Sequence, residues 1–222
     1  MRTLEAQTAG GPRARALASA SMIRCLLAVL ALAGVAHADG GDWERIADRD
    51  GIVIERRGVE GSSVREVRIT THATLPPAAI MATLWKHDEY VEFVPYLRRL
   101  DVLRDDGDVR LIYEQIRVPL VKDRDVTLRV RRTFSPETGV YEIASMAVPD
   151  EGPPESSAYV RVRTSVGRWR LAPAADGGTA VVYTVRTDAG GLLPAWIVNA
   201  AQKDVSAQLV RAMLERARHN NR

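Results

Sequence analysis

Cysteine is almost absent from this sequence of 222 residues, and its scarcity excludes several kinds of chemistry. The single cysteine, Cys25, lies in an N-terminal segment that we predict to be removed. The remaining chain then has no disulfide, no thiol nucleophile and no thiolate ligand for a metal. An exported protein without disulfides must rely on its hydrophobic core, and 46% of the residues are hydrophobic.

Net charge is also small once that segment is set aside. The whole chain has 31 Lys and Arg residues against 28 Asp and Glu residues. Residues 1–38 contain four of the arginines and one glutamate, which leaves 27 basic and 27 acidic residues. Binding to nucleic acid requires net positive charge or a dense basic face, because phosphates must be neutralised. We therefore predict no nucleic-acid partner.

Catalytic and metal-binding motifs are missing as well. The sequence has no phosphate-binding glycine loop, no nucleophile elbow and no H-E-x-x-H pattern. After residue 38 the histidines are His72, His87 and His219, and no metal-ligand spacing joins them. His87 is followed by Asp88 and Glu89, which indicates a solvated helix end. We predict no metal, no cofactor and no catalytic residue, although missing motifs do not exclude an enzyme.

Residues 1–38 have the pattern of a secretory signal peptide. Arginines precede an apolar run at residues 26–35, and the sequence Ala36-His37-Ala38 offers small residues to a signal peptidase. The run is shorter than the ~20 apolar residues that a spanning helix needs. We predict cleavage near Ala38, a periplasmic or secreted protein, and one domain over residues 39–222, with Met22 as an alternative start.

Alternating apolar and polar residues, separated by turn sequences, predict a sheet of antiparallel strands. Short helices are expected at 43–47, from Pro76-Pro77 to about 86, and at 90–93. In most strands one face is apolar and the other polar, so helices should cover a single side of the sheet. The expected strands cover residues 52–57, 64–71, 97–104, 109–118, 124–133, 140–147, 158–171 and 179–187.

The longest helix is expected at the C-terminal end, from Pro194 to about His219. Gly190-Gly191 free the backbone to turn, and proline suits the first turn of a helix. Apolar residues recur four apart from Ile197 to Met213, and Gln202 lies on the opposite, polar side. The sequence therefore predicts an α+β fold in which one long helix packs on an antiparallel sheet.

Glu114 interrupts the apolar face of the strand expected at 109–118. A carboxylate on an inward face must be paired, hydrogen-bonded or protonated, because burying it alone would cost several kcal/mol. One interpretation is a structural pair with an arginine. The other is a polar group in an apolar cavity that orients the hydroxyl or head group of a ligand.

Two segments resemble signatures of a known family. Tyr113-Glu114, Pro119 and Arg124-Asp125-Val126 resemble the central signature of the START (StAR-related lipid-transfer) family. The segment 190–199, with Gly191, Pro194 and Trp196, resembles its C-terminal signature. The resemblance covers residues 43–219. It implies a helix-grip fold, in which a curved antiparallel sheet wraps around the C-terminal helix and encloses a tunnel for one lipid or sterol.

One position departs from the family pattern. Some members place an arginine opposite the acid of the cavity, whereas this sequence has Val130 at that step. The departure predicts either a more apolar tunnel or a different partner for Glu114.

From residues alone, the run Lys122 to Asp125 indicates a solvated edge.

We predict a non-enzymatic carrier that binds one hydrophobic ligand, such as a lipid, a sterol-like compound or an isoprenoid. The alternative is a cyclase- or hydrolase-type enzyme on the same scaffold, with Glu114 as acid or base. We expect a monomer that contacts membranes at most transiently, and a loop at 148–155 that is either a lid or a solvated connection. The residues expected to line the tunnel are Trp85, Phe93, Glu114, Val126, Leu128, Val130, Trp169, Tyr183 and Met213.

Overall fold

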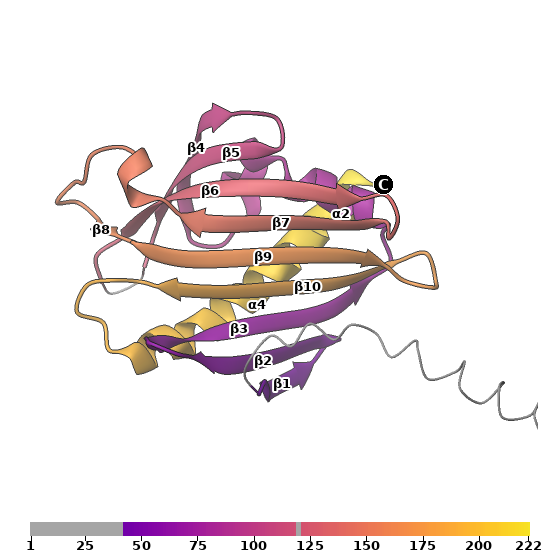
Figure 1. Ribbon diagram of the computed structural model, residues 1–222, viewed down its shortest axis with the longest axis horizontal. Helices are drawn as coiled ribbons and strands as arrows, with labels where there is room; N and C mark the ends of the chain where they lie inside the picture. The colour runs from indigo at the N-terminus through magenta and orange to yellow at the C-terminus, as the bar shows by residue number, and fades with distance from the viewer. Residues whose placement is uncertain (1–41, 119–120) are drawn as a thin grey trace, which may run out of the picture. The chain divides into compact units, whose positions relative to one another are not determined.

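The strands form a single ten-stranded sheet in the order β1-β2-β3-β10-β9-β7-β6-β5-β4, with β8 beside β6 (Figure 1). The computed structural model describes residues 42–118 and 121–222. Every neighbouring pair is antiparallel except β6 and β8. The strands are β1 Glu44–Arg49, β2 Ile52–Val59, β3 Ser62–Ala73, β4 Leu97–Asp105, β5 Val109–Ile116, β6 Arg124–Ser135, β7 Val140–Ala147, β8 Val160–Arg161, β9 Thr164–Pro173 and β10 Thr179–Asp188.

Helices lie on one side of this sheet. The long helix α4 crosses behind the strands in Figure 1 and packs on β3, β10 and α2. The helices are α2 Pro77–Leu84, α3 Tyr90–Phe93 and α4 Ala195–Asn220, with short 3-10 turns η1 His87–Glu89 and η2 Pro149–Glu151. The predicted architecture of a curved antiparallel sheet and a long C-terminal helix is confirmed.

Two segments differ from the prediction. Residues 44–49 form strand β1 rather than a short helix, because they pair with β2 and Glu44 binds Arg56 on that strand at 2.9 Å. The strand expected at 158–171 is broken into β8 and β9. The break occurs because β8 pairs in parallel with the start of β6, whereas β9 pairs with β7 and β10.

The buried face of α4 is also rotated from the predicted one. Val205 is 43% exposed and Trp196 is 72% exposed, although both were placed on the apolar stripe. Gln202, expected on the wet side, instead donates to the carbonyls of Arg65 on β3 and Val185 on β10. The buried positions of α4 are Val198, Ser206, Ala207, Val210, Met213, Leu214 and Ala217.

The physical reason lies in the sheet. The pairing of β3 with β10 ends at Val67 and Val185, so backbone groups beyond that point need other partners. Gln202 accepts from the amide of Thr187, and Asn199 accepts from the amide of Arg65. Two polar side chains thus turn this part of α4 toward the sheet, and the hydrophobic period alone could not reveal that requirement.

Candidate functional site

Glu114 lies on the face of β5 that points toward the helices. Its cross-strand neighbours are Leu100 on β4 and Val126 on β6, so apolar residues flank it on both sides. No residue within 42–118 and 121–222 forms a hydrogen bond or an ion pair with its carboxylate. Burial raises the pKa of Glu114 to about 7, because the charged form is poorly solvated there.

Two tyrosines from other elements approach this carboxylate. After burial, the charge of Glu114 contributes most to raising the pKa of both Tyr90 on α3 and Tyr183 on β10. Tyr90 donates its hydroxyl to the carbonyl of Leu84 at 2.7 Å. Tyr183 stacks on Trp169 of the neighbouring strand, with ring centroids 4.3 Å apart. One acid and two phenols therefore form the polar part of an otherwise apolar interior.

Space remains beside two of these groups. The Tyr183 hydroxyl, like the Glu114 carboxylate, has no hydrogen-bond partner in the described part of the chain. Among the described residues, only Thr127 Oγ1 is both fully enclosed and without a partner. The free oxygens of Glu114 and Tyr183 are therefore not sealed by neighbouring atoms. They face room that a small polar group could enter.

The other predicted tunnel residues lie in the same interior. Trp85, Val130, Trp169, Tyr183 and Met213 belong to the main hydrophobic core, against which Phe93 and Leu128 pack as partly buried residues. Val126 is buried as well, with 3% of its surface exposed. The fold thus brings all nine predicted residues to one side of the sheet; their contact with a ligand stays a prediction.

Trp85 also belongs to an aromatic cluster in which its ring contacts His87, and His87 in turn contacts Tyr90. Arg110 and Arg132 each place a guanidinium 4.6 Å from the centre of the Trp85 ring. His87 is only 3% exposed, so the prediction of a solvated helix end was wrong. Burial and the nearby charge of Arg110 lower the pKa of His87 to about 4, which keeps the ring neutral near pH 7. Within residues 42–118 and 121–222, no cluster of His, Cys, Asp or Glu could hold a metal.

Arg124, a residue of the central signature, holds the segment that leads into α4. It donates to the carbonyls of Ala189 at 3.1 Å and Gly190 at 3.4 Å. Gly190 and Gly191 both have positive φ, at 65° and 71°, which glycine adopts readily. Pro194 then caps the start of the helix, as predicted. The two signatures, far apart in sequence, therefore meet at this turn.

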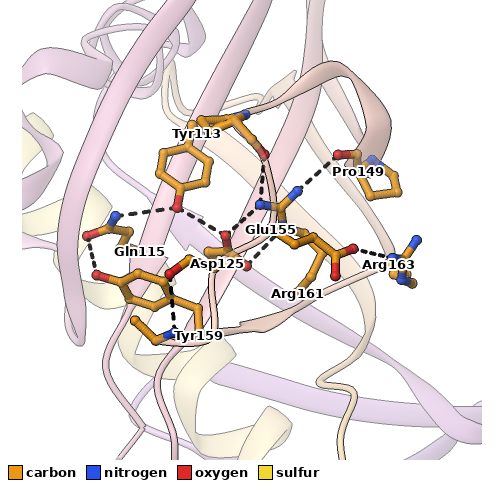
Figure 2. A network of polar contacts seen from close by, with 11 residues as sticks. Tyr113, Gln115, Asp125, Pro149, Glu155, Tyr159, Arg161 and Arg163 are labelled. Atoms are coloured by element: carbon orange, nitrogen blue, oxygen red, sulfur yellow. Dashed lines mark hydrogen bonds and ion pairs between the residues drawn. The ribbon is translucent and has the colours of Figure 1, made fainter.

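Asp125 points to the opposite face of β6 and is bound there by a polar network (Figure 2). Arg161 donates to both of its oxygens, at 2.9 and 2.7 Å, and Tyr113 donates at 3.0 Å. Arg161 also binds the carbonyls of Pro149 and Pro153, each at 3.0 Å. The network ties the segment 148–155 to the outer face of the sheet.

The prediction of a solvated edge at residues 122–125 was therefore wrong for Arg124 and Asp125, whereas Lys122 is exposed as expected. Arg124 is 4% exposed and Asp125 is 1% exposed. Alternation along the strand placed Asp125 and Thr127 on a wet face, but the segment 148–155 covers that face locally. A Cβ built on Gly152 would lie 1.8 Å from Thr127 Oγ1, which shows how closely this segment packs. One usable signal was present in the sequence: Arg161 and Arg163, two residues apart, share the polar face of an expected strand.

A groove lies at the surface, at the β6–β7 turn and the neighbouring part of β9. This groove of about 310 Å³ is lined by side chains that include the exposed Phe134 and Arg170 and the partly exposed Glu142. It is open to solvent. The interior beside Glu114, rather than this groove, has the features of a binding site.

None of the helices described in the structure is long and apolar enough to cross a membrane.

Comparison with known proteins gives consistent results. The family model named START domain matches residues 27–222, a range that begins within the segment predicted as a leader. An uncharacterised protein of Pseudomonas aeruginosa is 28% identical over 187 residues, which are 84% of this chain and 91% of that protein.

Solved structures with the same fold include both transfer proteins and an enzyme. A STAR-related lipid transfer protein fragment from Xanthomonas axonopodis has a TM-score of 0.73 and 24% identity, covering 79% of this chain and 98% of that one. Human StAR-related lipid transfer protein 5 has a TM-score of 0.73 at 13% identity, with coverages of 90% and 94%. The Zhui aromatase/cyclase from Streptomyces sp. R1128 has a TM-score of 0.53 at 20% identity, with coverages of 71% and 96%. At these identities the likeness is one of fold.

Proposed function

Because the chain belongs to the START domain family, which binds hydrophobic ligands, we propose that it encloses one lipid-like molecule between the sheet and α4 and carries it without chemical change. The observation that carries the proposal is the pair Glu114 and Tyr183, whose oxygens have no partner among the described residues yet are not fully enclosed by the apolar side chains around them. An apolar site with a few converging polar groups is typical of small-molecule binding.

The absence of a second catalytic group near Glu114 supports a carrier over an enzyme. General acid–base catalysis needs groups whose pKa lies near the working pH. The pKa values of Tyr90 and Tyr183 are both raised by burial, so neither phenol exchanges protons readily near neutral pH. Among the described residues, no other titratable side chain acts on Glu114 strongly enough to alter its pKa.

One observation favours the enzyme as a second candidate. The pKa of Glu114, at about 7, is the value that suits a general acid or base. A neighbour in fold is an aromatase/cyclase. Substitution of Glu114 by Gln separates the two functions: a carrier retains its ligand with altered affinity, whereas an enzyme binds its substrate and loses turnover.

Native mass spectrometry of the protein purified after export tests the carrier. We expect a stoichiometric lipid or isoprenoid that is lost on denaturation. Leu128→Trp, on the inner face of β6, should exclude the ligand, and Ala144→Trp, at an exposed position of β7, should not. An empty protein that also takes up nothing from vesicles of phosphatidylethanolamine and phosphatidylglycerol would contradict the proposal.

Ligand exchange at a membrane is proposed to occur at the start of α4. Leu192 and Trp196 are 102% and 72% exposed there, beside the turn at Gly190-Gly191. Tryptophan prefers the interface between lipid and water. Replacing both residues with Ser should slow transfer between vesicles while leaving the bound ligand in place. Unchanged transfer would place the membrane contact elsewhere.

Action outside the cytoplasm as a monomer is also part of the proposal. The basis is the leader-like sequence at residues 1–38, which lies outside the described residues. N-terminal sequencing of the exported protein should begin at Asp39, and light scattering should give the mass of a single chain. Retention of residues 1–38 in the purified protein would contradict cleavage.

A further inference from the structure

The environment of Glu114 restricts the chemistry of the ligand, and the inference that follows rests on the proposed function. We propose that the ligand is a neutral lipid whose polar end meets Glu114 as an uncharged carboxylic acid. Binding should therefore strengthen as the pH falls through neutrality.

The groups that face Glu114 carry no compensating charge. Leu100 on β4 and Val126 on β6 flank it, and the titratable groups close enough to interact are the phenols of Tyr90 on α3 and Tyr183 on β10. One further buried ionisable residue, His87 on η1, contacts Tyr90, and burial and the charge of Arg110 keep its ring neutral near pH 7. The buried side chains of α2, α4, β7 and β9 are not ionisable: they are Ile80, Met81, Thr83 and Leu84 on α2, Ile143 on β7, Trp169 and Leu171 on β9, and the seven residues given above for α4.

An anionic head group has no partner in this interior. A phosphate beside Glu114 would bring two like charges together where water is scarce. Arg110, the arginine whose charge reaches Tyr90, is already bound by Asp105, His87 and the carbonyl of Trp85. Releasing it would leave those groups unsatisfied. Lipids with a phosphate head group are therefore expected to bind poorly with that group inside.

A neutral oxygen fits better than an amine. When an apolar ligand expels water, a carboxylate next to it loses its remaining solvation, whereas a carboxylic acid can donate a hydrogen bond. Tyr183, which is close enough to feel the charge of Glu114, offers a hydroxyl without a partner among the described residues. Together the acid and the phenol can satisfy a hydroxyl or carbonyl oxygen. A protonated amine would require two ions to be desolvated at once, and that penalty can exceed their attraction.

The pH dependence follows from proton linkage. If the ligand binds only the protonated form, its apparent dissociation constant is the intrinsic one divided by the protonated fraction. The free protein has a Glu114 pKa of about 7. Above that pH, the dissociation constant should rise about tenfold per pH unit. Below it, the dissociation constant should level off.

The test uses three radiolabelled probes that share one chain: dodecanol, dodecyl phosphate and dodecylamine. Retention of each probe by the exported protein is measured on a desalting column from about pH 5.5 to about pH 8.5, a range that brackets the titration. We expect dodecanol to bind best and to weaken about 30-fold between the lowest and the highest pH, with most of the loss above pH 7. Glu114→Gln should bind dodecanol with a flat pH profile.

Two further variants complete the design. Glu114→Leu provides a second uncharged replacement, and its profile should also be flat. Glu142→Gln removes a carboxyl from β7, which pairs with Arg168 on the solvent side, and should keep the profile of the unmodified protein. A pH-independent profile in the unmodified protein, or tighter binding of dodecylamine with rising pH, would overturn the inference while leaving the carrier intact. If no probe binds at any pH and no lipid co-purifies, the proposed function itself fails.

Discussion

Two carboxyl groups on adjacent strands of the sheet are buried in opposite ways. Asp125 on β6 points outward beneath the segment 148–155, where Arg161 and Tyr113 bind both of its oxygens. Glu114 on β5 points inward among apolar side chains, and no described residue binds it. Asp125 is 1% exposed and fully bonded, whereas Glu114 is partly exposed and has no bonded partner among the described residues. Partners and accessible surface together distinguish a structural acid from one that can serve a ligand.

The difference has a thermodynamic meaning. A buried ion pair with further hydrogen bonds fixes the position of the elements that it joins. A buried acid without partners lowers stability in its charged form, and a protein retains such a group when something else uses it. The network of Asp125, Arg161 and Tyr113, here called the outer network, thus secures the fold. Glu114, here called the inner acid, is a feature that only a ligand would explain.

The largest expected effect comes from breaking the outer network. Asp125→Ala leaves the guanidinium of Arg161 buried without its carboxylate, and this should reduce the free energy of unfolding by about 3–5 kcal/mol. Denaturant unfolding monitored by circular dichroism measures the loss. Glu155→Ala, which removes the exposed partner of Arg163, serves as a control and should change little. A loss no larger than that of the control would show that the network does not secure the fold.

The inner acid should behave in the opposite manner. Because folding raises the pKa of Glu114 from 4.5 to about 7, the folded protein holds a proton that the unfolded chain releases above pH 4.5. Its contribution to stability is therefore complete below about pH 4.5 and declines as the pH rises through 7. Glu114→Gln should gain about 3 kcal/mol over the unmodified protein near pH 8 and almost nothing near pH 4.5.

That difference is measured by urea unfolding of the two proteins at both pH values. His87 titrates in the same way in both, so its contribution cancels. Glu114→Gln should also retain the folded structure at every pH where the unmodified protein is folded. A loss of stability near pH 8 would mean that the carboxylate has a partner that supports the fold.

A smaller effect is expected where the segment 148–155 meets the sheet. Gly152→Ala would place a Cβ 1.8 Å from Thr127 Oγ1, so the segment must move away. Overpacking of this kind lowers stability by about 1–3 kcal/mol. Hydrogen exchange should speed up at Arg161 and Val162, whose region this segment covers, and remain unchanged in β3. Equal protection in variant and unmodified protein would show that the contact is easily relaxed.

The smallest effect concerns Thr127, whose Oγ1 is enclosed without a partner. Thr127→Val removes an unsatisfied polar atom and should raise the free energy of unfolding by about 1 kcal/mol. Unlike Glu114, this group faces no open space, so ligand binding should not change. Thermal unfolding and the dodecanol assay check the two expectations. Altered binding would extend the site to the outer face.

Much of the fold was predictable because its signals are local. Alternation along β5, β6 and β10, the turn glycines, and the proline at the start of α4 each depend on a few neighbouring residues. The inward position of Glu114 followed from the same alternation, since a strand has only two faces. The resemblance at residues 113–126 and 190–199 pointed to the START family, and the match of the chain to the model of that family then confirmed it.

What the sequence by itself determined was most of the strands, the long helix and the single acid on an apolar face, because period and turn chemistry act over short distances. Strand β1 and the break between β8 and β9 depended on pairing with other strands. Only the tertiary structure decided which polar residues are buried. Asp125, His87 and Gln202 were expected in water, yet each is enclosed by or bonded to segments distant in sequence: Arg161 and the segment 148–155, Arg110, and the ends of β3 and β10. The partners of a polar side chain are set by packing across the fold, and no local pattern encodes them.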